Sequence, residues 1–403
     1  MRILLLTQWF QPEPQFKGLP LAKALIERGH EVEVLTGFPN YPGGKLYPGY
    51  RVRAWQREMM DGVAVTRAAL YPSHDRSALK RILNYASFAV SSALLSFTLR
   101  RPDVVYVYCP PMTAAAAAVA LYLTRGVPYL VDVQDLWPDT LASTGMVGNK
   151  LVMRLVGAWT GFAMRRAARL VVLSPGFKER IAERAIRTPI DVIPNWAPPE
   201  IEAQALRLGP PRAVDDGTFN IVFAGNMGKA QALDTVIQAA QKLQREAPKV
   251  RFTLVGGGVE LEHLRAASKA AGTDNVEFLP QRPICEMKPV FAAADTLLVH
   301  LRDDPLFEIT IPSKTQAYLA IGRPLLMGVR GDAADLTEAA GAGLAFDPEN
   351  ADSLAAAAMR LAKMTPEARA AMGRAGAAYY REHLAFDKGV AALEEALIKA
   401  AGG

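Results

Sequence analysis

The chain has 403 residues, half of them hydrophobic, and only two cysteines. A single hydrophobic core seldom grows beyond roughly 250 residues, so this length predicts two domains. Cys109 and Cys285 lie far apart in the sequence, which argues against a disulfide framework and favours a reducing cytoplasm. We expect no metal site, because neither the cysteines nor the five histidines have the spacing of metal ligands.

The formal net charge of +6 is unevenly distributed along the chain. Residues 1–195 contain 24 Lys/Arg and 14 Asp/Glu, whereas the remaining residues contain 22 and 26. Basic residues flank the apolar segment 85–99, which is typical either of a helix in the interface of an anionic membrane or of a core helix with solvated charged ends. No aromatic-plus-basic motif accompanies the charge, so we expect no nucleic-acid partner. Segments 85–99 and 112–124 are shorter than the roughly 20 residues that a membrane-spanning helix needs.

The first half of the chain alternates short apolar runs with helical patterns. Residues 1–10 lack the basic region and the cleavage site of a secretory signal, so we expect a buried first strand there. Such alternation predicts parallel βαβ units. The expected strands are Arg2–Thr7, Glu31–Thr36, Val63–Thr66, Val104–Tyr108, Tyr129–Val133, Arg169–Leu173 and Asp191–Ile193.

A second alternating set follows a segment rich in proline and charge, residues 196–217, which we interpret as a linker. The expected strands of this set are Phe219–Gly225, Val250–Gly256, Val276–Leu279, Asp295–Leu301 and Pro324–Gly328. The fold class is therefore α/β, with two Rossmann-like, doubly wound domains at 1–195 and 218–375, followed by C-terminal helices at 376–403. Ligands of such folds bind beyond the carboxyl ends of the strands.

The segment 307–324 combines a carboxylate, a Ser-Lys pair and a helix start. Pro312 favours the first turn of a helix, so Ser313 falls where backbone N–H groups have no partner within the helix. These donors and the helix dipole attract phosphate, and Lys314 adds a positive charge. Glu308 lies far enough upstream to bind a sugar hydroxyl. The alternative is an ordinary helix cap.

A second phosphate-binding pattern, residues 223–231, follows a predicted strand. Gly225 and Gly228 allow close approach of the backbone, which suits a diphosphate. The alternative is a simple turn from strand to helix. The side chains that would donate hydrogen bonds are Asn226, Lys229 and Gln231.

Three aspartates, Asp132, Asp135 and Asp139, lie where the predicted strand 129–133 ends and its loop begins. We expect Asp135 to be the one nearest the reacting sugar, whereas Asp139, beside Pro138, fits a helix cap better. Gly18, in the loop after the first strand, lets backbone approach a phosphate or acceptor, or serves packing equally well. For His300 we expect a structural role.

These motifs together resemble family 4 glycosyltransferases of the GT-B fold over essentially the whole chain. The resemblance rests on residues 28–42, 135–139, 192–196, 225–228 and 312–318, and is strongest to bacterial surface-polysaccharide enzymes of the N-acetyl-fucosamine and colanic-acid type. It implies a retaining, metal-independent transfer without a cofactor. The nucleotide sugar would bind to the C-terminal domain and the acceptor to the N-terminal domain, against which the helices 376–403 would pack.

In that scheme Lys229, Ser313 and Lys314 neutralise the leaving diphosphate. We expect the backbone around Gln281 and Arg282 to contact the base, with a UDP-sugar favoured. The acceptor would be a lipid-linked or other surface-polysaccharide glycan. We expect a cytoplasmic enzyme, associated with the inner face of the membrane through its basic N-terminal domain.

The chain departs from the family pattern at two places. The paired glutamates of the family fall at Ile309 and Ala317, so a shift of one residue would give their contacts to Glu308 and Gln316. The cleft histidine of many members is replaced by Gln134. A degenerate glycosyltransferase that only binds a sugar nucleotide or glycan, and a nucleotide-sugar epimerase, are therefore alternatives.

Overall fold

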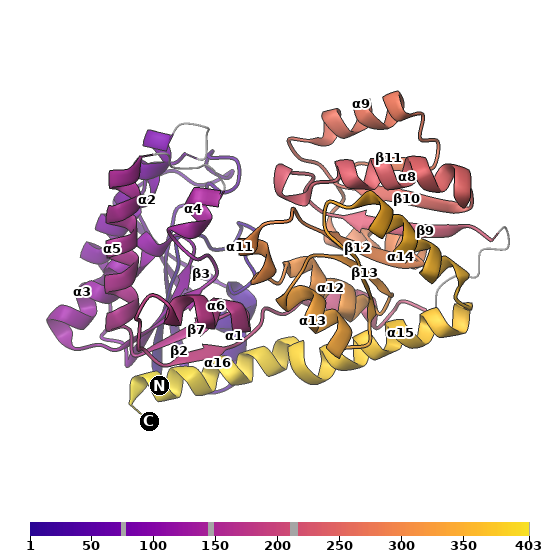
Figure 1. Cartoon of the computed structure of the whole chain (residues 1–403). Helices are drawn as coiled ribbons and strands as arrows, with labels where there is room; N and C mark the ends of the chain where they lie inside the picture. The colour runs from indigo at the N-terminus through magenta and orange to yellow at the C-terminus, as the bar shows by residue number, and fades with distance from the viewer. Residues whose placement is uncertain (74–77, 144–148, 210–216, 403) are drawn as a thin grey trace. The chain divides into compact units, whose positions relative to one another are not determined.

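The computed structural model describes residues 1–73, 78–143, 149–209 and 217–402. The chain divides into two compact units, each with its own sheet (Figure 1). Unit 1 comprises residues 1–194 and 389–403, and unit 2 comprises residues 195–388. The predicted fold class, two Rossmann-like α/β domains, is confirmed.

Unit 1 contains an eight-stranded sheet in the order β3-β4-β2-β1-β5-β6-β7-β8. Neighbouring strands are parallel except β3 and β4. The central strands are buried along their length, as their continuous apolar runs predict. The strands are β1 Arg2–Leu6, β2 Glu31–Gly37, β3 Trp55–Met60, β4 Val63–Ala68, β5 Val104–Cys109, β6 Tyr129–Val133, β7 Arg169–Val172 and β8 Ile190–Val192.

Strand β3 is absent from the sequence prediction. It lies at the edge of the sheet, and its alternation of exposed and half-buried residues gives no apolar run. A signal was nevertheless present, because Asp61-Gly62 joins β3 to β4 with positive φ at both residues. This is the two-residue hairpin turn that Asp-Gly favours.

The helices of unit 1 begin at recognisable caps. Asn149 accepts hydrogen bonds from the N–H groups of Leu151 and Val152, and Ser174 accepts one from Phe177. The helices are α1 Leu19–Glu27, α2 Ala78–Ser96, the 3-10 turn η1 Met112–Ala114, α3 Ala115–Arg125, α4 Asp139–Ser143, α5 Lys150–Arg166 and α6 Pro175–Ala182, together with the part of α16 (Phe386–Ala401) from Gly389 onward.

The predicted apolar helical segments 85–99 and 112–124 correspond to α2 and to η1 with α3. No helix among the described residues is both long and apolar enough to cross a membrane.

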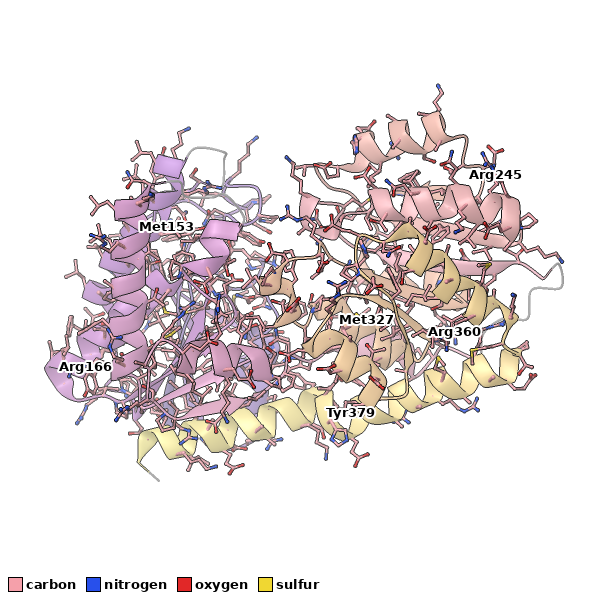
Figure 2. All side chains as sticks on the ribbon, in the orientation of Figure 1. Met153, Arg166, Arg245, Met327, Arg360 and Tyr379 are labelled. Carbon is pink, nitrogen blue, oxygen red and sulfur yellow. The ribbon has the colours of Figure 1, made fainter. Side chains whose placement is uncertain are left out.

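Unit 2 contains a six-stranded, fully parallel sheet in the order β11-β10-β9-β12-β13-β14. The three-residue strand β14 was not predicted, because it is too short to give a pattern. The strands are β9 Phe219–Ala224, β10 Val250–Val255, β11 Val276–Leu279, β12 Thr296–His300, β13 Leu325–Gly328 and β14 Gly343–Ala345. Met327, labelled in Figure 2, is fully buried on β13.

The helices of unit 2 cover this sheet. They are α7 Pro199–Ala205, η2 Lys229–Gln231, α8 Asp234–Glu246, α9 Leu261–Ala271, η3 Ile284–Glu286, α10 Lys288–Ala292, α11 Pro305–Glu308, α12 Ser313–Ile321, α13 Asp332–Ala339, α14 Ala351–Lys363, α15 Pro366–Tyr379 and the π-helix η4 Tyr380–Leu384.

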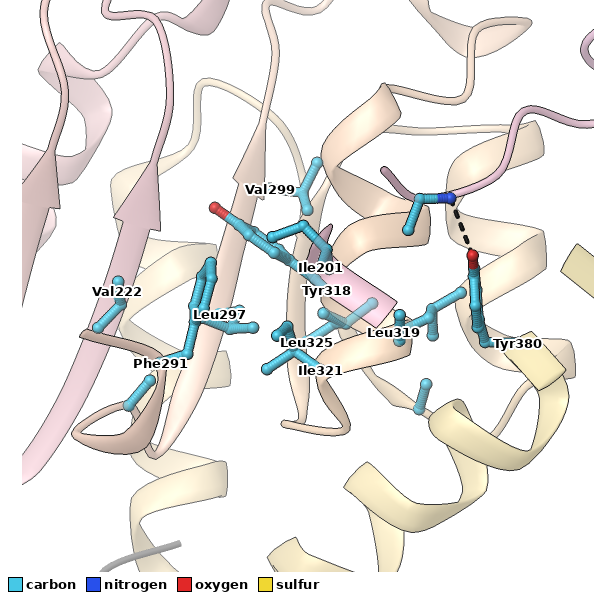
Figure 3. Packing of buried hydrophobic residues seen from close by; sticks show 14 of the residues in the cluster. Ile201, Val222, Phe291, Leu297, Val299, Tyr318, Leu319, Ile321, Leu325 and Tyr380 are labelled. Carbon is cyan, nitrogen blue, oxygen red and sulfur yellow. Dashed lines mark hydrogen bonds between the residues drawn. The ribbon is translucent and has the colours of Figure 1, made fainter. Parts of the chain in front are cut away.

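The structure corrects the predicted linker 196–217 in its first part. Ile201 of α7 is buried in the core of unit 2, and the backbone N–H of Ala197 donates to the hydroxyl of Tyr380 at 2.9 Å (Figure 3). Residues 210–216 lie outside the described part of the chain. The C-terminal segment also differs from the predicted 376–403, because the contacts of unit 1 begin at Gly389. There Glu394 binds Arg28 and His30.

Each sheet has one point where the strand order reverses. In unit 1 it lies between β1 and β5, and in unit 2 between β9 and β12. Loops that leave such neighbouring strands in opposite directions open a crevice at the strand ends. The loops after β1 and β9 are therefore the parts of each sheet best placed to hold a ligand.

A buried ion pair supports the strand ends of unit 1. Lys17 Nζ lies 2.6 Å from Asp132 Oδ2, both side chains are fully buried, and the Tyr106 hydroxyl donates to the same oxygen at 2.7 Å. We predict that Lys17→Met lowers the free energy of unfolding by about 3–5 kcal/mol, because it leaves the Asp132 carboxylate buried without its cation. Thermal unfolding of this variant and of Lys17→Met/Asp132→Asn tests this. Equal stability of Lys17→Met and wild type would contradict it.

Candidate functional site

The loop after β9 is held close to the loop after β10. The N–H of Met227 donates to the carbonyl of Gly257 at 2.7 Å, and the N–H of Glu260 donates to the carbonyl of Met227 at 3.0 Å. Gly256 has φ +144°, and a Cβ there would lie 2.0 Å from the carbonyl oxygen of Gly225. Only glycine permits this approach. The Gly-Gly-Gly sequence thus shapes the loop that follows β9.

Gly256→Ala should therefore unfold this corner of unit 2. We expect a loss of about 3 kcal/mol or more, because the substitution combines a strained φ with a backbone clash. Gly257→Ala is the matched control, since its nearest neighbour would be the Gln281 side chain at 3.8 Å and its φ is not positive. The comparison is made by thermal unfolding. The explanation fails if the two variants unfold at the same temperature.

Lys314 brings the two predicted phosphate-binding motifs together. Helix α12 begins at Ser313 with Pro312 as its N-cap, as the sequence predicts. Lys314 Nζ lies 3.7 Å from the centre of the Phe223 ring on β9 and 3.2 Å from the position of a Cβ on Gly225. Residues almost ninety positions apart thus form one basic corner at the end of β9.

This amine is buried without a hydrogen-bond partner among the described residues. Burial lowers its pKa from 10.5 to about 7, because the charged form loses its hydration. The Phe223 ring gives a cation only weak compensation. An unpaired buried amine is costly, and an anion at the strand end would relieve that cost.

Tyr318 fixes α12 to β9. Its hydroxyl accepts a hydrogen bond from the N–H of Ala224 at 2.8 Å and donates to the carbonyl of Ala224 at 3.0 Å. The side chain is buried one helical turn after Lys314, so it sets the distance between that lysine and the strand end. Sequence reasoning missed this positioning role, although the spacing of four residues from Lys314 placed both on one helix face.

Gln316, predicted to contact the ribose, has hydrogen-bond partners within its own helix. It is fully buried, and its amide, with the nitrogen toward the start of the helix, donates to the carbonyls of Pro312 at 3.0 Å and Ser313 at 3.2 Å. These contacts favour a structural role for Gln316, in which its side chain stabilises the first turn of α12. Glu308, at the end of α11, is exposed, as is Ser313.

The remaining donor-side residues lie in the segment after β9 and in the segment after β11. Gln231 accepts a hydrogen bond from the N–H of Gly228 at 3.0 Å, which orders the 3-10 turn η2. Lys229 and Asn226 are exposed beside it. The other exposed residues of the prediction are Gln281 and Arg282, between β11 and η3.

His300 is structural, as predicted. Its Nδ1 lies 2.7 Å from the carbonyl of Gln231, and its Nε2 accepts from the N–H of Glu349 at 3.0 Å. Both nitrogens are thus used by the neutral ring. Burial lowers its pKa, in agreement with this assignment.

In unit 1 the carboxyl of Asp135 lies on the loop after β6. Burial raises the pKa of Asp135 to about 6. The charge of Asp135 in turn contributes to the raised pKa values of Tyr41, Tyr85 and Tyr108. A carboxyl with this pKa is ionised at neutral pH yet basic enough to accept a proton. Asp139 begins α4 and pairs with Arg180 and Arg184.

Gln134 and Gly18 have structural contacts. The amide of Gln134 donates to Asp132 Oδ1, so it is bonded to the carboxylate of the buried Lys17–Asp132 ion pair. Gly18 is buried against the side chain of Gln11, whose Oε1 accepts from the first N–H of α1 at 2.8 Å. A Cβ on Gly18 would lie 2.3 Å from that oxygen, so the glycine leaves room for the Gln11 side chain, and an approach of phosphate or acceptor to Gly18 stays a prediction.

Glu13 is a residue that sequence reasoning missed. Its buried carboxylate accepts hydrogen bonds from the N–H groups of Phe10, Asn40 and Tyr41 at 2.7–2.9 Å. Burial still raises its pKa to about 7. Glu13 thereby joins the loop after β1 to the loop after β2 and holds Tyr41, which stacks on Trp9 with ring centres 4.5 Å apart. A proline-rich loop gave no signal of this role.

Comparison with known families supplies the class of protein. The model described as "Glycosyl transferase 4-like domain" matches residues 19–196, and the model described as "Glycosyl transferases group 1" matches residues 218–364. The chain belongs to the family 4 glycosyltransferases. It is thus a glycosyltransferase of a retaining family that uses nucleotide-sugar donors.

Individual relatives agree with this assignment. The chain is 28% identical over 314 residues to the putative colanic acid biosynthesis glycosyl transferase WcaI of Escherichia coli, covering 74% of this chain and 75% of that protein. It is 28% identical over 392 residues to the 2-deoxystreptamine N-acetyl-D-glucosaminyltransferase of Streptomyces fradiae, covering 85% and 88%. A solved structure described as trehalose-6-phosphate from E. coli bound with UDP-2-fluoro glucose shares the GT-B fold, with a TM-score of 0.72, 14% identity and coverage of 100% and 99%.

Proposed function

We propose that this glycosyltransferase moves a sugar from a UDP-sugar to a lipid-linked or other surface-polysaccharide acceptor, without a metal ion. The observation that carries the donor side is the buried Lys314 amine at the end of β9, which has no hydrogen-bond partner in the described part of the chain. Lys314 stands in the first turn of α12, and the exposed Lys229 belongs to the 3-10 turn η2 that follows the glycine loop after β9. Together they would hold the diphosphate of the donor.

In this proposal the basic corner has its largest effect as the donor bond breaks. Negative charge then accumulates on the leaving diphosphate, and a preorganised cation stabilises that charge more than it stabilises the ground state. Lys314 is already desolvated and fixed by α12, so little reorganisation is needed. Asp135 would accept a hydrogen bond, or the proton, from the acceptor hydroxyl. The sequence similarity to the putative colanic acid biosynthesis glycosyl transferase WcaI supports a polysaccharide acceptor.

A lipid-linked acceptor would bring the enzyme to the cytoplasmic face of a membrane. Uracil is favoured as the base because the structural neighbour named above contains a UDP-sugar analogue. We expect the base near the exposed Gln281 and Arg282, at the end of β11 beside the glycines that follow β10.

Isothermal titration with nucleoside diphosphates in the presence of EDTA tests the donor part of the proposal. We expect UDP to bind. Failure of UDP, GDP, ADP and dTDP alike would contradict it, whereas preference for a base other than uracil would correct only the identity of the donor. Transfer from the matching nucleotide sugar to a membrane lipid extract then tests the acceptor.

Binding of the diphosphate should depend on pH in a defined direction. Lys314 has a pKa of about 7 in the empty site, and a bound diphosphate raises that pKa by favouring the charged form. Above pH 7 the empty protein must therefore take up a proton to bind, and affinity should fall up to about tenfold per pH unit until the pKa of the complex is reached. Calorimetry at pH 8 in buffers of different ionisation enthalpy measures the uptake, expected to approach one proton. Absence of uptake would contradict the assignment.

A further inference from the structure

Helix α2 of unit 1 presents its apolar side outward. The exposed large side chains are Leu79, Ile82, Leu83, Val90 and Leu94, between 43% and 68% accessible. At 100° per residue these positions fall within an arc of about 120° and so form one stripe.

The opposite face of α2 has the reverse character. Between residues 79 and 96, where burial is described, the fully buried residues of α2 are Asn84, Phe88, Ser92 and Ser96, of which only one is apolar. A helix on the surface of a water-soluble domain normally buries its apolar stripe and exposes its polar residues. Core packing therefore does not explain the leucines of α2. The exposed leucines are explained if α2 binds another apolar surface outside the domain.

Two neighbouring helices extend this surface. Helix α3 contacts both α2 and α5, and the three lie together in Figure 1. Leu123 of α3 and Leu151 and Leu155 of α5 are each about 60% exposed. Arg166 lies near one end of α5 and Met153 toward the other (Figure 2), and the Arg166 guanidinium packs over the Phe162 ring at 5.6 Å.

The charge of the three helices has one sign. Their described sequences contain no Asp or Glu, but contain the basic residues Lys80, Arg81, Arg125, Lys150, Arg154, Arg165 and Arg166. Apolar side chains interspersed with cations, on helices whose described residues include no carboxylate, complement the headgroups of anionic lipids and the acyl boundary beneath them. A protein partner would need a matching acidic and apolar face, for which the chain offers no indication.

We propose that the outer face of α2, α3 and α5 is a membrane-docking surface, on which the leucines enter the headgroup region of an anionic bilayer while the arginines and lysines bind lipid phosphates. The contact is peripheral, since the helices lie along the surface. α2 also carries Asn84, which bonds to Gln8 at the end of β1 and to Asn40. Docking would therefore bring the loops after β1 and β2, which Asn84 contacts, close to the lipid. This inference rests on the proposed function and adds the place where a lipid-linked acceptor would reach the enzyme.

Flotation of the purified protein with phosphatidylcholine vesicles, with and without phosphatidylglycerol, tests the docking surface. We expect binding that requires phosphatidylglycerol and weakens at high salt. Leu83→Glu/Leu94→Glu should reduce the partition coefficient at least about tenfold, since the variant loses the burial of two leucine side chains in the lipid and adds two negative charges. The matched control, Met59→Glu/Leu206→Glu, places the same charges on exposed apolar positions of β3 and of the end of α7, and should bind vesicles like wild type.

Binding of nucleoside diphosphate is measured on the same preparations and should be unchanged in both double variants, which confirms that they are folded and separates this test from that of the donor site. Equal vesicle binding by wild type and the α2 variant would overturn the docking surface. So would sedimentation showing a dimer of the wild type that the α2 variant dissociates, because the face would then be an interface between two copies of the chain.

Discussion

Lys314→Met should make the empty protein more stable and the enzyme inactive. The stabilisation is expected because the folded state buries the amine with no hydrogen-bond partner from the residues that the structure describes, at a pKa of about 7 instead of 10.5. Between these values the unfolded state binds more protons than the folded state, so the lysine disfavours folding most at the lower end of this window and below it. Methionine has a similar length and needs no hydration, and it removes this penalty.

The loss of activity has the same cause. A buried cation that waits for a diphosphate is most valuable when the leaving group carries its full charge. Removal of one charge-assisted contact costs roughly 1.5–3 kcal/mol in binding, and the loss of rate is expected to be larger, about 100-fold or more. The melting temperature and the rate of donor turnover are measured on the same samples. Lys269→Met, on the exposed side of α9, is the control and should change neither.

A lysine that merely packs in the core would give a different result. In that case Lys314→Met would retain turnover, whatever its stability. A variant that melts earlier and also loses activity would contradict the account too, because the buried amine would then be a net stabilising group.

Asp135→Asn should abolish transfer while leaving the nucleotide site intact. If the carboxylate accepts the proton of the acceptor hydroxyl, its loss should cost about 100- to 10,000-fold in rate. The wild-type kcat/KM for the acceptor should rise as the pH increases through about 6, where Asp135 ionises. The variant should lack this rising limb of the pH profile. The measurement is a pH profile of transfer with a saturating donor.

The stability of this variant provides an internal check. The pKa of Asp135 is raised from 3.8 to about 6, so the ionised carboxylate disfavours folding above pH 6, and asparagine should be neutral or stabilising there. Asp61→Asn, in the exposed turn between β3 and β4, is the control and should keep full activity. Retention of the pH limb in Asp135→Asn would assign that ionisation to another group.

The sequence predicted those features that depend on local pattern. The parallel strands follow from apolar runs between helical segments, and the start of α12 follows from Pro312. The proximity of Lys314 to Gly225 could be anticipated, because both motifs follow parallel strands of one sheet and so reach the same edge.

Features that depend on tertiary contacts could not be predicted in this way. The amide of Gln316 turns toward its own helix because it is buried there, and no pattern reveals the direction of a side chain. Glu13 sits in a proline-rich loop, and its importance comes from three backbone N–H groups brought to it by folding. The excess of basic residues in the first half was visible in the sequence. Only the exposure of the α2 leucines shows on which helix face the apolar side chains lie beside these basic residues.

The central claim is that unit 2 binds the diphosphate of the donor through Lys314. Titration of UDP into wild type and Lys314→Met, side by side at pH 7 in the presence of EDTA, tests it most directly. The account predicts binding by wild type and an affinity about 10- to 150-fold weaker in the variant. Equal affinity of the two proteins would contradict it.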